Sequence, residues 1–319
     1  MDELTIALEL YDRHLPFFLG TVKPPDGMTL RALEVGMVPP RRHGISRHAR
    51  FLKGEFDIAE HSLASYIIGV ERGLPFGAVP VFPRRLFSQN HIFVNTNAGI
   101  RNPSDLIGRR VGVGAFQITM AVLAKGDLKT EYGVPWDQIH WVTTRAEEIP
   151  VDYGMHLERA KGPIDELLFN GQIDALIYPH PPPRVLERDP RVRRLFADAR
   201  GESTRYYRRH GWYPIMHLLA FKRELAERKP DLPRALIGMW EEAKRQTREY
   251  YDDPGYALLA FSRTEYEAQR DTLAPELWPS GIKANRANLE HFMAYCVDQR
   301  LIKAPVPIER LFHESVLDT

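Results

Sequence analysis

The sequence predicts an α/β protein of two lobes, with a cleft between the lobes and a helical C-terminal section on the first lobe. Residues 52–62 and 169–180 share one pattern: an apolar residue, a polar residue, Gly, a polar residue, an apolar residue, Asp and a short apolar run. Gly54 and Gly171 suit the position after a helix, where glycine adopts the left-handed conformation without strain. The apolar runs are short enough to be buried strands. Two such helix-turn-strand units in a chain of 319 residues predict two similar lobes.

Composition indicates an ordinary globular protein and excludes several classes. Apolar residues make up 44% of the chain, and the net charge of +1 gives no electrostatic basis for binding nucleic acid or an anionic membrane. No apolar window is long enough for a membrane span, and the N-terminus shows no signal peptide, so we expect a cytoplasmic protein. Cys296 lies in an apolar helical context, which favours a buried, inert thiol over a nucleophile.

The first lobe is predicted to span residues 1–84. Apolar runs predict strands at 4–10, 28–35, 56–60 and 78–82. Helices are expected at 43–53 and from Ser62, a suitable N-cap, to Arg72. Residues 83–85 begin the crossing to the second lobe.

The second lobe is predicted to span residues 85–214, with strands at 91–95, 109–113 and 139–143. A helix runs from about 117 to 132 and is stopped by Gly133, and another covers 163–170. Residues 215–221 form a strand that returns to the first lobe. Helices at 233–249, 288–299 and 307–314 complete that lobe over residues 215–319.

Ionisable side chains follow the predicted strands, where α/β sheets bind their ligands. Arginines such as Arg13 and Arg85 suit carboxylates, and a histidine can move a proton near neutral pH. Each has a plainer interpretation: Arg85 as a solvated residue, His61 as a helix cap and His217 as a core histidine. Adjacent strand residues such as Glu60 and His61 point to opposite faces, so the sequence favours no metal site.

Several short pieces, in order along nearly the whole chain, carry a family resemblance. They are Tyr11-Asp12-Arg13, residues 54–60 with 62–66, Pro80-Val81-Phe82-Pro83 with Arg85, Gln117-x-Thr119, Tyr206-Tyr207-Arg208-Arg209, Pro214-Ile215-Met216-His217 and Trp278-Pro279-x-Gly281. Together they resemble the 4,5-dihydroxyphthalate decarboxylase family, whose members are similar in fold to type II periplasmic binding proteins but act as cytosolic enzymes.

The resemblance implies non-oxidative decarboxylation of a hydroxylated aromatic (di)carboxylic acid to a phenolic product such as protocatechuate, without an organic cofactor. The catalytic candidates are His217, Glu60 and His61; the substrate-binding candidates are Arg13, Ser62, Arg85, Gln117, Thr119 and His180. In this scheme the arginines hold carboxylates, Glu60 or His61 takes a ring hydroxyl proton, and His217 supplies a proton to carbon. His61 stands where an apolar residue such as Met is expected, and His180 also departs from the pattern, so the substrate can be another aromatic acid.

Two rival functions remain open at this point. One is a solute-binding protein of a transporter, which needs an export signal or a lipid-anchor cysteine. The other is an aromatic-acid sensor that keeps the fold without catalysis. The expected partner is a small aromatic carboxylate, and a homo-oligomer is compatible with the sequence.

Overall fold

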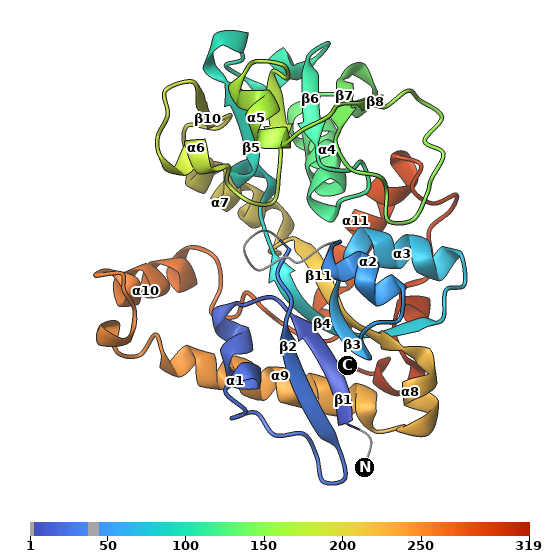
Figure 1. Cartoon of the computed structure of the whole chain (residues 1–319). Coiled ribbons are helices and arrows are strands. Elements are labelled where there is room, and N and C mark those ends of the chain that lie inside the picture. Colours follow the sequence, from blue (N-terminus) through green and yellow to red (C-terminus); the bar gives the residue numbers. More distant parts are fainter. Residues whose placement is uncertain (1–2, 38–44) are drawn as a thin grey trace. The chain divides into compact units, whose positions relative to one another are not determined.

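The computed structural model describes residues 3–37 and 45–319, and the chain divides into two compact units (Figure 1). The first unit contains residues 1–84, 217–289 and 306–319; the second contains residues 85–216 and 290–305. The helical C-terminal section was expected entirely on the first lobe, and this is wrong for residues 290–305. They join the second unit because Gln299 bonds the Val122 carbonyl at 2.8 Å, and the Tyr295 ring occupies the space that a side chain at Gly126 would need.

The first unit is built on a five-stranded sheet in the order β2-β1-β3-β11-β4. Its strands are β1 (Glu3–Leu8), β2 (Thr29–Glu34), β3 (Ile58–Ser62), β4 (Phe76–Arg85) and β11 (Ile215–Lys222). Strand β1 runs parallel to both β2 and β3, whereas β11 runs antiparallel to β3. The carboxyl ends of β1, β2 and β3 therefore meet at one edge of the sheet.

Helices cover this sheet and close its core. They are α1 (Leu15–Phe18), α2 (Arg47–Leu52), α3 (Leu63–Glu71), α8 (Arg223–Arg228) and α9 (Leu232–Glu249). Helix α10 (Ser262–Thr272) also belongs to this unit but stands apart from the sheet (Figure 1). Buried sheet residues such as Ile6 and Val81 share a core with Leu236 and Trp240 on one face of α9. As predicted, Ser62 caps α3 by accepting a bond from the Ser65 N–H. Of the helix expected at 43–53, residues 43 and 44 lie outside the described residues.

The second unit has a six-stranded sheet in the order β10-β5-β9-β6-β7-β8. Its strands are β5 (Ile92–Asn95), β6 (Arg110–Val113), β7 (His140–Thr143), β8 (Glu158–Arg159), β9 (Ala175–Ile177) and β10 (Val192–Arg194). Its helices are α4 (Thr119–Tyr132), α5 (Ile164–Phe169), α6 (Pro183–Leu186), α7 (Ala199–His210) and α11 (Arg286–Asp298), the last of which begins in the first unit. Gly133 ends α4 with a φ of +67°.

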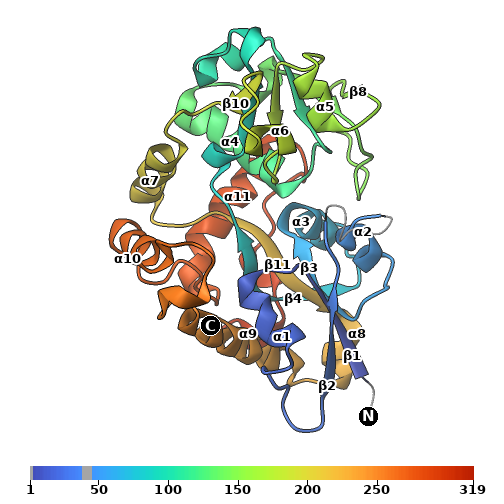
Figure 2. The same cartoon turned by 60° about the vertical axis from the view of Figure 1, so that its left-hand side comes forward.

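The two stretches with the shared pattern occupy equivalent places in the two sheets. Figure 2 shows β3 beside β11 in the first unit. Strand β3 lies between parallel β1 and antiparallel β11, and β9 lies between parallel β6 and antiparallel β5. Gly54 and Gly171 follow α2 and α5 with φ of +76° and +70°. The predicted helix, glycine turn and buried strand are therefore confirmed in both units.

Candidate active site

Glu60, the third residue of β3, has a carboxylate that is completely buried. Nη2 of Arg47 lies 2.9 Å from Oε2, and Nδ1 of His217 lies 2.5 Å from Oε1. The Tyr11 hydroxyl donates to Oε1, and the Glu9 backbone N–H donates to Oε2, both at 3.3 Å. A buried carboxylate needs such partners in place of water. These groups form one connected polar cluster inside the first unit.

Arg47 is fully buried and joins the ends of three parallel strands. Ser46 caps α2 and places Arg47 at its first position. Besides the Glu60 carboxylate, Nε donates to the Glu60 carbonyl at 3.0 Å and Nη1 donates to the Val35 carbonyl at 2.5 Å. The Glu9 carboxylate lies 3.7 Å from Nη1. Arg47 thereby fixes the sheet edge from which the Glu60 side chain projects.

His217 reaches Glu60 through the pairing of β11 with β3. The register places His217 opposite Ser62, so Glu60 is its diagonal neighbour on the same face. His217 retains 7% exposure, and no residue in the described part of the chain is hydrogen-bonded to its Nε2. One imidazole nitrogen is thus held by a carboxylate, and the other remains available.

The charges of this pair follow from opposing effects. Burial alone would raise the pKa of Glu60, but the Arg47 guanidinium and the His217 bond outweigh it and hold that pKa well below its usual range. Burial lowers the pKa of His217 to about 4, against the attraction of Glu60. At neutral pH the pair is therefore an ionised Glu60 and a neutral His217, with Nδ1–H donating and Nε2 carrying a lone pair.

This charge state disagrees with the expectation that His217 supplies a proton from its resting form. The physical reason is burial, which disfavours the imidazolium more than one neighbouring carboxylate stabilises it. A neutral histidine oriented by a carboxylate is instead the arrangement of a general base.

Two further histidine rings pack beside His217. His48 on α2 meets His217 and His61 edge to face, with ring centroids 4.8 and 5.1 Å apart. His61 is 1% exposed, and neither of its ring nitrogens has a hydrogen-bond partner among the described residues. Burial and the nearby His217 lower the pKa of His61 to about 3, so this ring is neutral. His61 therefore lies inside the cluster, but it has no hydrogen-bonded link to Glu60.

Arg13 lies beside the cluster in a stack of rings. Its guanidinium carbon is 4.2 Å from the ring centroids of both Tyr11 and Trp278. Nε donates to the Pro83 carbonyl at 2.7 Å, and Nη1 donates to Asp12 at 3.1 Å. The same Tyr11 that stacks on Arg13 bonds Glu60, so the arginine adjoins the Glu60–His217 pair. Stacking leaves the guanidinium plane fixed, which suits recognition of a planar carboxylate.

The other sequence-predicted residues differ in their surroundings. Ser62 uses its hydroxyl to cap α3. Arg85 belongs to the second unit, where Nη1 donates to the Tyr213 carbonyl at 2.8 Å. Gln117 is also in the second unit, and its amide bonds both backbone groups of Ile149, at 2.7 and 3.4 Å.

Thr119 is the buried first residue of α4 in the second unit. His180 follows β9 and is partly exposed, with its ring centroid 5.8 Å from that of Tyr178. The structure thus brings Glu60, His61, His217 and Ser62 together, with Arg13 adjoining. The substrate-binding roles of the second-unit residues stay predictions.

Sequence reasoning missed Arg47, Tyr11 and His48 as parts of the site. A signal was present for Arg47: with Ser46 as N-cap, Arg47 and Phe51 stand four residues apart and so share one helix face. Phe51 is completely buried, as is Arg47. Tyr11 belongs to the motif Tyr11-Asp12-Arg13 of the family resemblance, but its bond to Glu60, 49 residues away in sequence, depends on the fold.

The described residues contain neither a cluster of metal ligands nor a membrane-spanning helix. Within 3–37 and 45–319, no three or more His, Cys, Asp or Glu side chains gather in a way that would hold a metal ion. Over the same residues, no helix is both long and apolar enough to cross a membrane.

Comparison with known proteins decides the family. The chain is 31% identical over 330 aligned residues to a 4,5-dihydroxyphthalate decarboxylase of Comamonas testosteroni, and the match covers 99% of this chain and 98% of that protein. The chain belongs to the 4,5-dihydroxyphthalate decarboxylase family. A second member, from Pseudomonas putida, is 32% identical over 169 residues, covering 50% of this chain and 66% of that protein. No family model matches the sequence.

Solved structures confirm the fold class. The alkanesulfonate-binding protein SsuA of Xanthomonas axonopodis pv. citri, bound to MOPS, superimposes with a TM-score of 0.60 at 14% identity and covers 98% of each chain. A likeness at this identity shows the fold alone. This member of the decarboxylase family therefore has the two-lobed α/β fold of type II periplasmic binding proteins.

Proposed function

We propose that this protein is a carboxy-lyase that removes CO2 from a hydroxylated aromatic (di)carboxylate resembling 4,5-dihydroxyphthalate. The observation that carries the proposal is the buried Glu60 carboxylate, which is paired with Arg47 and lies 2.5 Å from Nδ1 of His217. Membership of the family supports the reaction class. The stacked Arg13 supplies a fixed cation for a carboxylate of the substrate.

The reaction starts at a ring hydroxyl ortho or para to the carbon that carries the departing carboxylate. Nε2 of His217 takes the hydroxyl proton, and Glu60 stabilises the imidazolium that forms. The ring electrons move to the ipso carbon, which gains a proton from solvent and becomes tetrahedral. The C–C bond then breaks, CO2 leaves, and the bonding electrons restore the aromatic ring as a phenolate. His217 returns its proton to the phenolate oxygen, so one solvent proton is consumed for each CO2 formed.

Each protein group has a stated part in this scheme. Arg47 keeps Glu60 ionised, and Glu60 holds the His217 ring in the tautomer with a free lone pair on Nε2. No organic cofactor enters these steps, because the hydroxyl group itself provides the electrons that accumulate at the ipso carbon. We further propose that the protein acts in the cytoplasm.

The test incubates purified protein with 4,5-dihydroxyphthalate, other hydroxylated aromatic acids, and phthalate as the analogue without hydroxyl groups. We expect CO2 and a phenolic product from hydroxylated acids and none from phthalate. His217→Gln is expected to lose activity by roughly 10²–10⁴-fold, the usual contribution of one positioned base. The matched control is His140→Gln, a change at an exposed strand residue of the second unit.

Two results would contradict the proposal. A protein that binds an aromatic acid tightly but releases no CO2 is the non-catalytic sensor. A fully active His217→Gln variant removes this residue from the mechanism. The pH profile gives an independent reading: kcat/KM should fall as the pH drops through about 4, the pKa of His217, instead of near the ordinary histidine value.

A further inference from the structure

An apolar surface lies on the segment that joins α9 to α10. We call residues 250–272 the arm, and its four most exposed large apolar side chains, Tyr256, Leu258, Leu259 and Phe261, the arm surface. Their exposed fractions are 69%, 103%, 70% and 74%. Isolated apolar residues are normal on a protein surface, but four within six residues are a concentrated patch. In Figure 1, α10 stands apart from the sheet of its unit.

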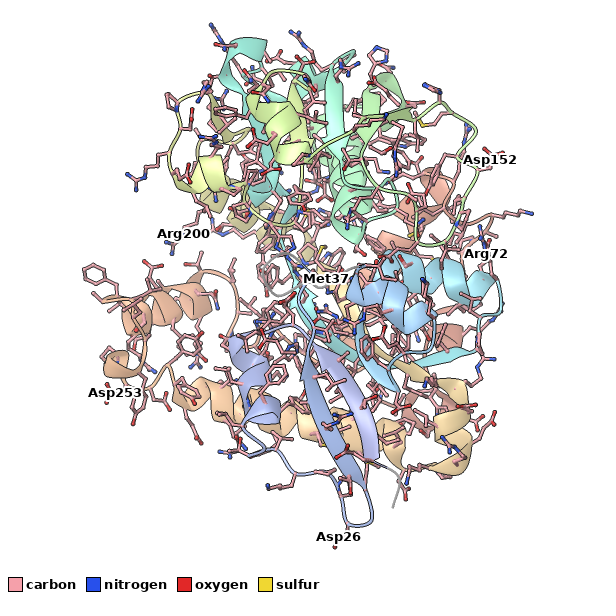
Figure 3. The ribbon with its side chains drawn as sticks, in the orientation of Figure 1. Asp26, Met37, Arg72, Asp152, Arg200 and Asp253 are labelled. Carbon is pink, nitrogen blue, oxygen red and sulfur yellow. The ribbon has the colours of Figure 1, made fainter. Side chains whose placement is uncertain are left out.

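Ring contacts and hydrogen bonds fix the conformation of the arm and leave the arm surface exposed to solvent. Tyr251 stacks on Tyr266 with ring centroids 5.2 Å apart and donates its hydroxyl to Asp12. Arg263 bonds Glu267 and the Tyr251 carbonyl. Asp253 marks the connection between α9 and α10 in Figure 3. The contacts that fix the arm therefore use its polar atoms and its tyrosine rings, including that of Tyr256 against Tyr250, and they leave Leu258, Leu259 and Phe261 uncovered.

The area is large enough for a specific contact. Large apolar side chains carry roughly 150–250 Å² each, so the arm surface offers on the order of 500 Å². If two molecules exchange arms, two such contacts form, each burying both faces. The total is then on the order of 2,000 Å², within the size of stable interfaces.

The charges of the arm restrict what covers it. Over residues 250–272 there are five acidic residues and two arginines, and none of the basic residues falls in 250–261. An anionic membrane would therefore repel this surface. A counterpart must be basic and must accept apolar side chains.

Helix α7 of the second unit has both properties. Arg200, Arg205, Arg208 and Arg209 are exposed along it. A hollow of about 420 Å³ lies on this helix and is lined by Asp198, Arg200, Gly201, Thr204, Arg205 and Arg208. The long stems of arginines can pack against apolar side chains while their guanidinium groups meet carboxylates.

We propose that the arm surface is a docking site for a second copy of this chain, with the arginine face of α7 as its counterpart. In reciprocal docking each copy donates its arm to the other, so the two contacts are equivalent. The apolar residues provide most of the buried area, and the acidic arm and basic helix set the orientation.

The test measures molar mass by light scattering after size-exclusion chromatography, over protein concentrations from about 1 to 100 μM, a range chosen to bracket typical affinities. The wild type is expected to form a dimer or larger assembly. Leu258→Ser and Leu259→Ser should each weaken association by about tenfold or more, because each removes an exposed apolar side chain that the proposed interface buries. Leu186→Ser is the matched control, since Leu186 is 65% exposed on α6, and it should leave the mass unchanged.

A charge test addresses the counterpart. Arg208→Glu should weaken association, and combining it with Asp253→Arg should restore part of it. Unchanged thermal unfolding in these surface variants shows that the fold is intact. A wild type that is monomeric at every concentration, or arm variants with the wild-type mass, would overturn the proposal. Pelleting with anionic phosphatidylglycerol vesicles that is lost in Leu258→Ser would overturn it in favour of a membrane surface.

Discussion

Replacing Arg47 by methionine should destabilise the first unit by about 3–5 kcal/mol, the usual cost of breaking a buried ion pair. The variant keeps most of the side-chain volume but leaves Glu60 buried without its cation, and the Val35 carbonyl loses its donor. The free energy of unfolding of a typical domain is about 5–15 kcal/mol, so this loss would be a large fraction of the stability of the unit. The loss should be visible in urea unfolding followed by far-ultraviolet circular dichroism.

A neighbouring arginine provides the control for this experiment. Arg50 lies one helical turn away and pairs with the half-exposed Glu55, so Arg50→Met should cost about 0–1 kcal/mol. The double variant Arg47→Met/Glu60→Gln should recover part of the loss, because it removes the unpaired charge as well. If Arg47→Met unfolds within about 1 kcal/mol of the wild type, the ion pair does not have the role assigned to it.

The pH dependence of Arg47→Met adds a signed expectation. In the wild type, the depressed pKa of Glu60 contributes stability above its ordinary value near 4.5, and this is lost as the pH falls through the folded-state pKa. Without Arg47, burial acts with less opposition and the pKa of Glu60 rises. The decrease in the free energy of unfolding that Glu60 causes at low pH should therefore be smaller or reversed in the variant, whereas the wild type should show it in full.

Three further changes test other parts of the molecule. Arg13→Lys should raise KM several-fold with little change in kcat, because lysine keeps the charge but not the planar stacked fork; equal KM values would make Arg13 structural. Burial raises the pKa of Asp127 to about 7, so the folded state holds this proton more tightly and stability should fall as the pH rises from about 4 to 7. Asp127→Asn should remove that slope in unfolding experiments, and an unchanged slope would contradict the assignment. His61→Met should leave the free energy of unfolding unchanged or raise it by about 1–3 kcal/mol, because it removes two buried ring nitrogens without hydrogen-bond partners among the described residues. A marked loss of stability would show that these nitrogens are hydrogen-bonded in solution.

The sequence by itself determined the local units and the family. Gly54 and Gly171 mark helix ends because a left-handed backbone is a property of the residue itself, and the short apolar runs after them become strands by the same local logic. Ser62 is likewise predicted as a cap from local sequence, because a serine hydroxyl can accept a hydrogen bond from an N–H in the first turn of the helix that follows. Glu60 and His217 were singled out individually, each as a polar residue at the end of, or within, an apolar run.

Only the tertiary structure decided how these residues act together. Glu60 and His217 are 157 residues apart, and they meet because β11 pairs with β3 in one particular register. The stack of Arg13 on Trp278, and the assignment of residues 290–305 to the second unit, likewise depend on contacts distant in sequence. The charge state of His217 was beyond sequence reasoning too, because a pKa is set by burial and by the neighbours that folding brings to the group. Local propensity acts over a few residues, whereas partnership and burial exist only once distant segments have packed together.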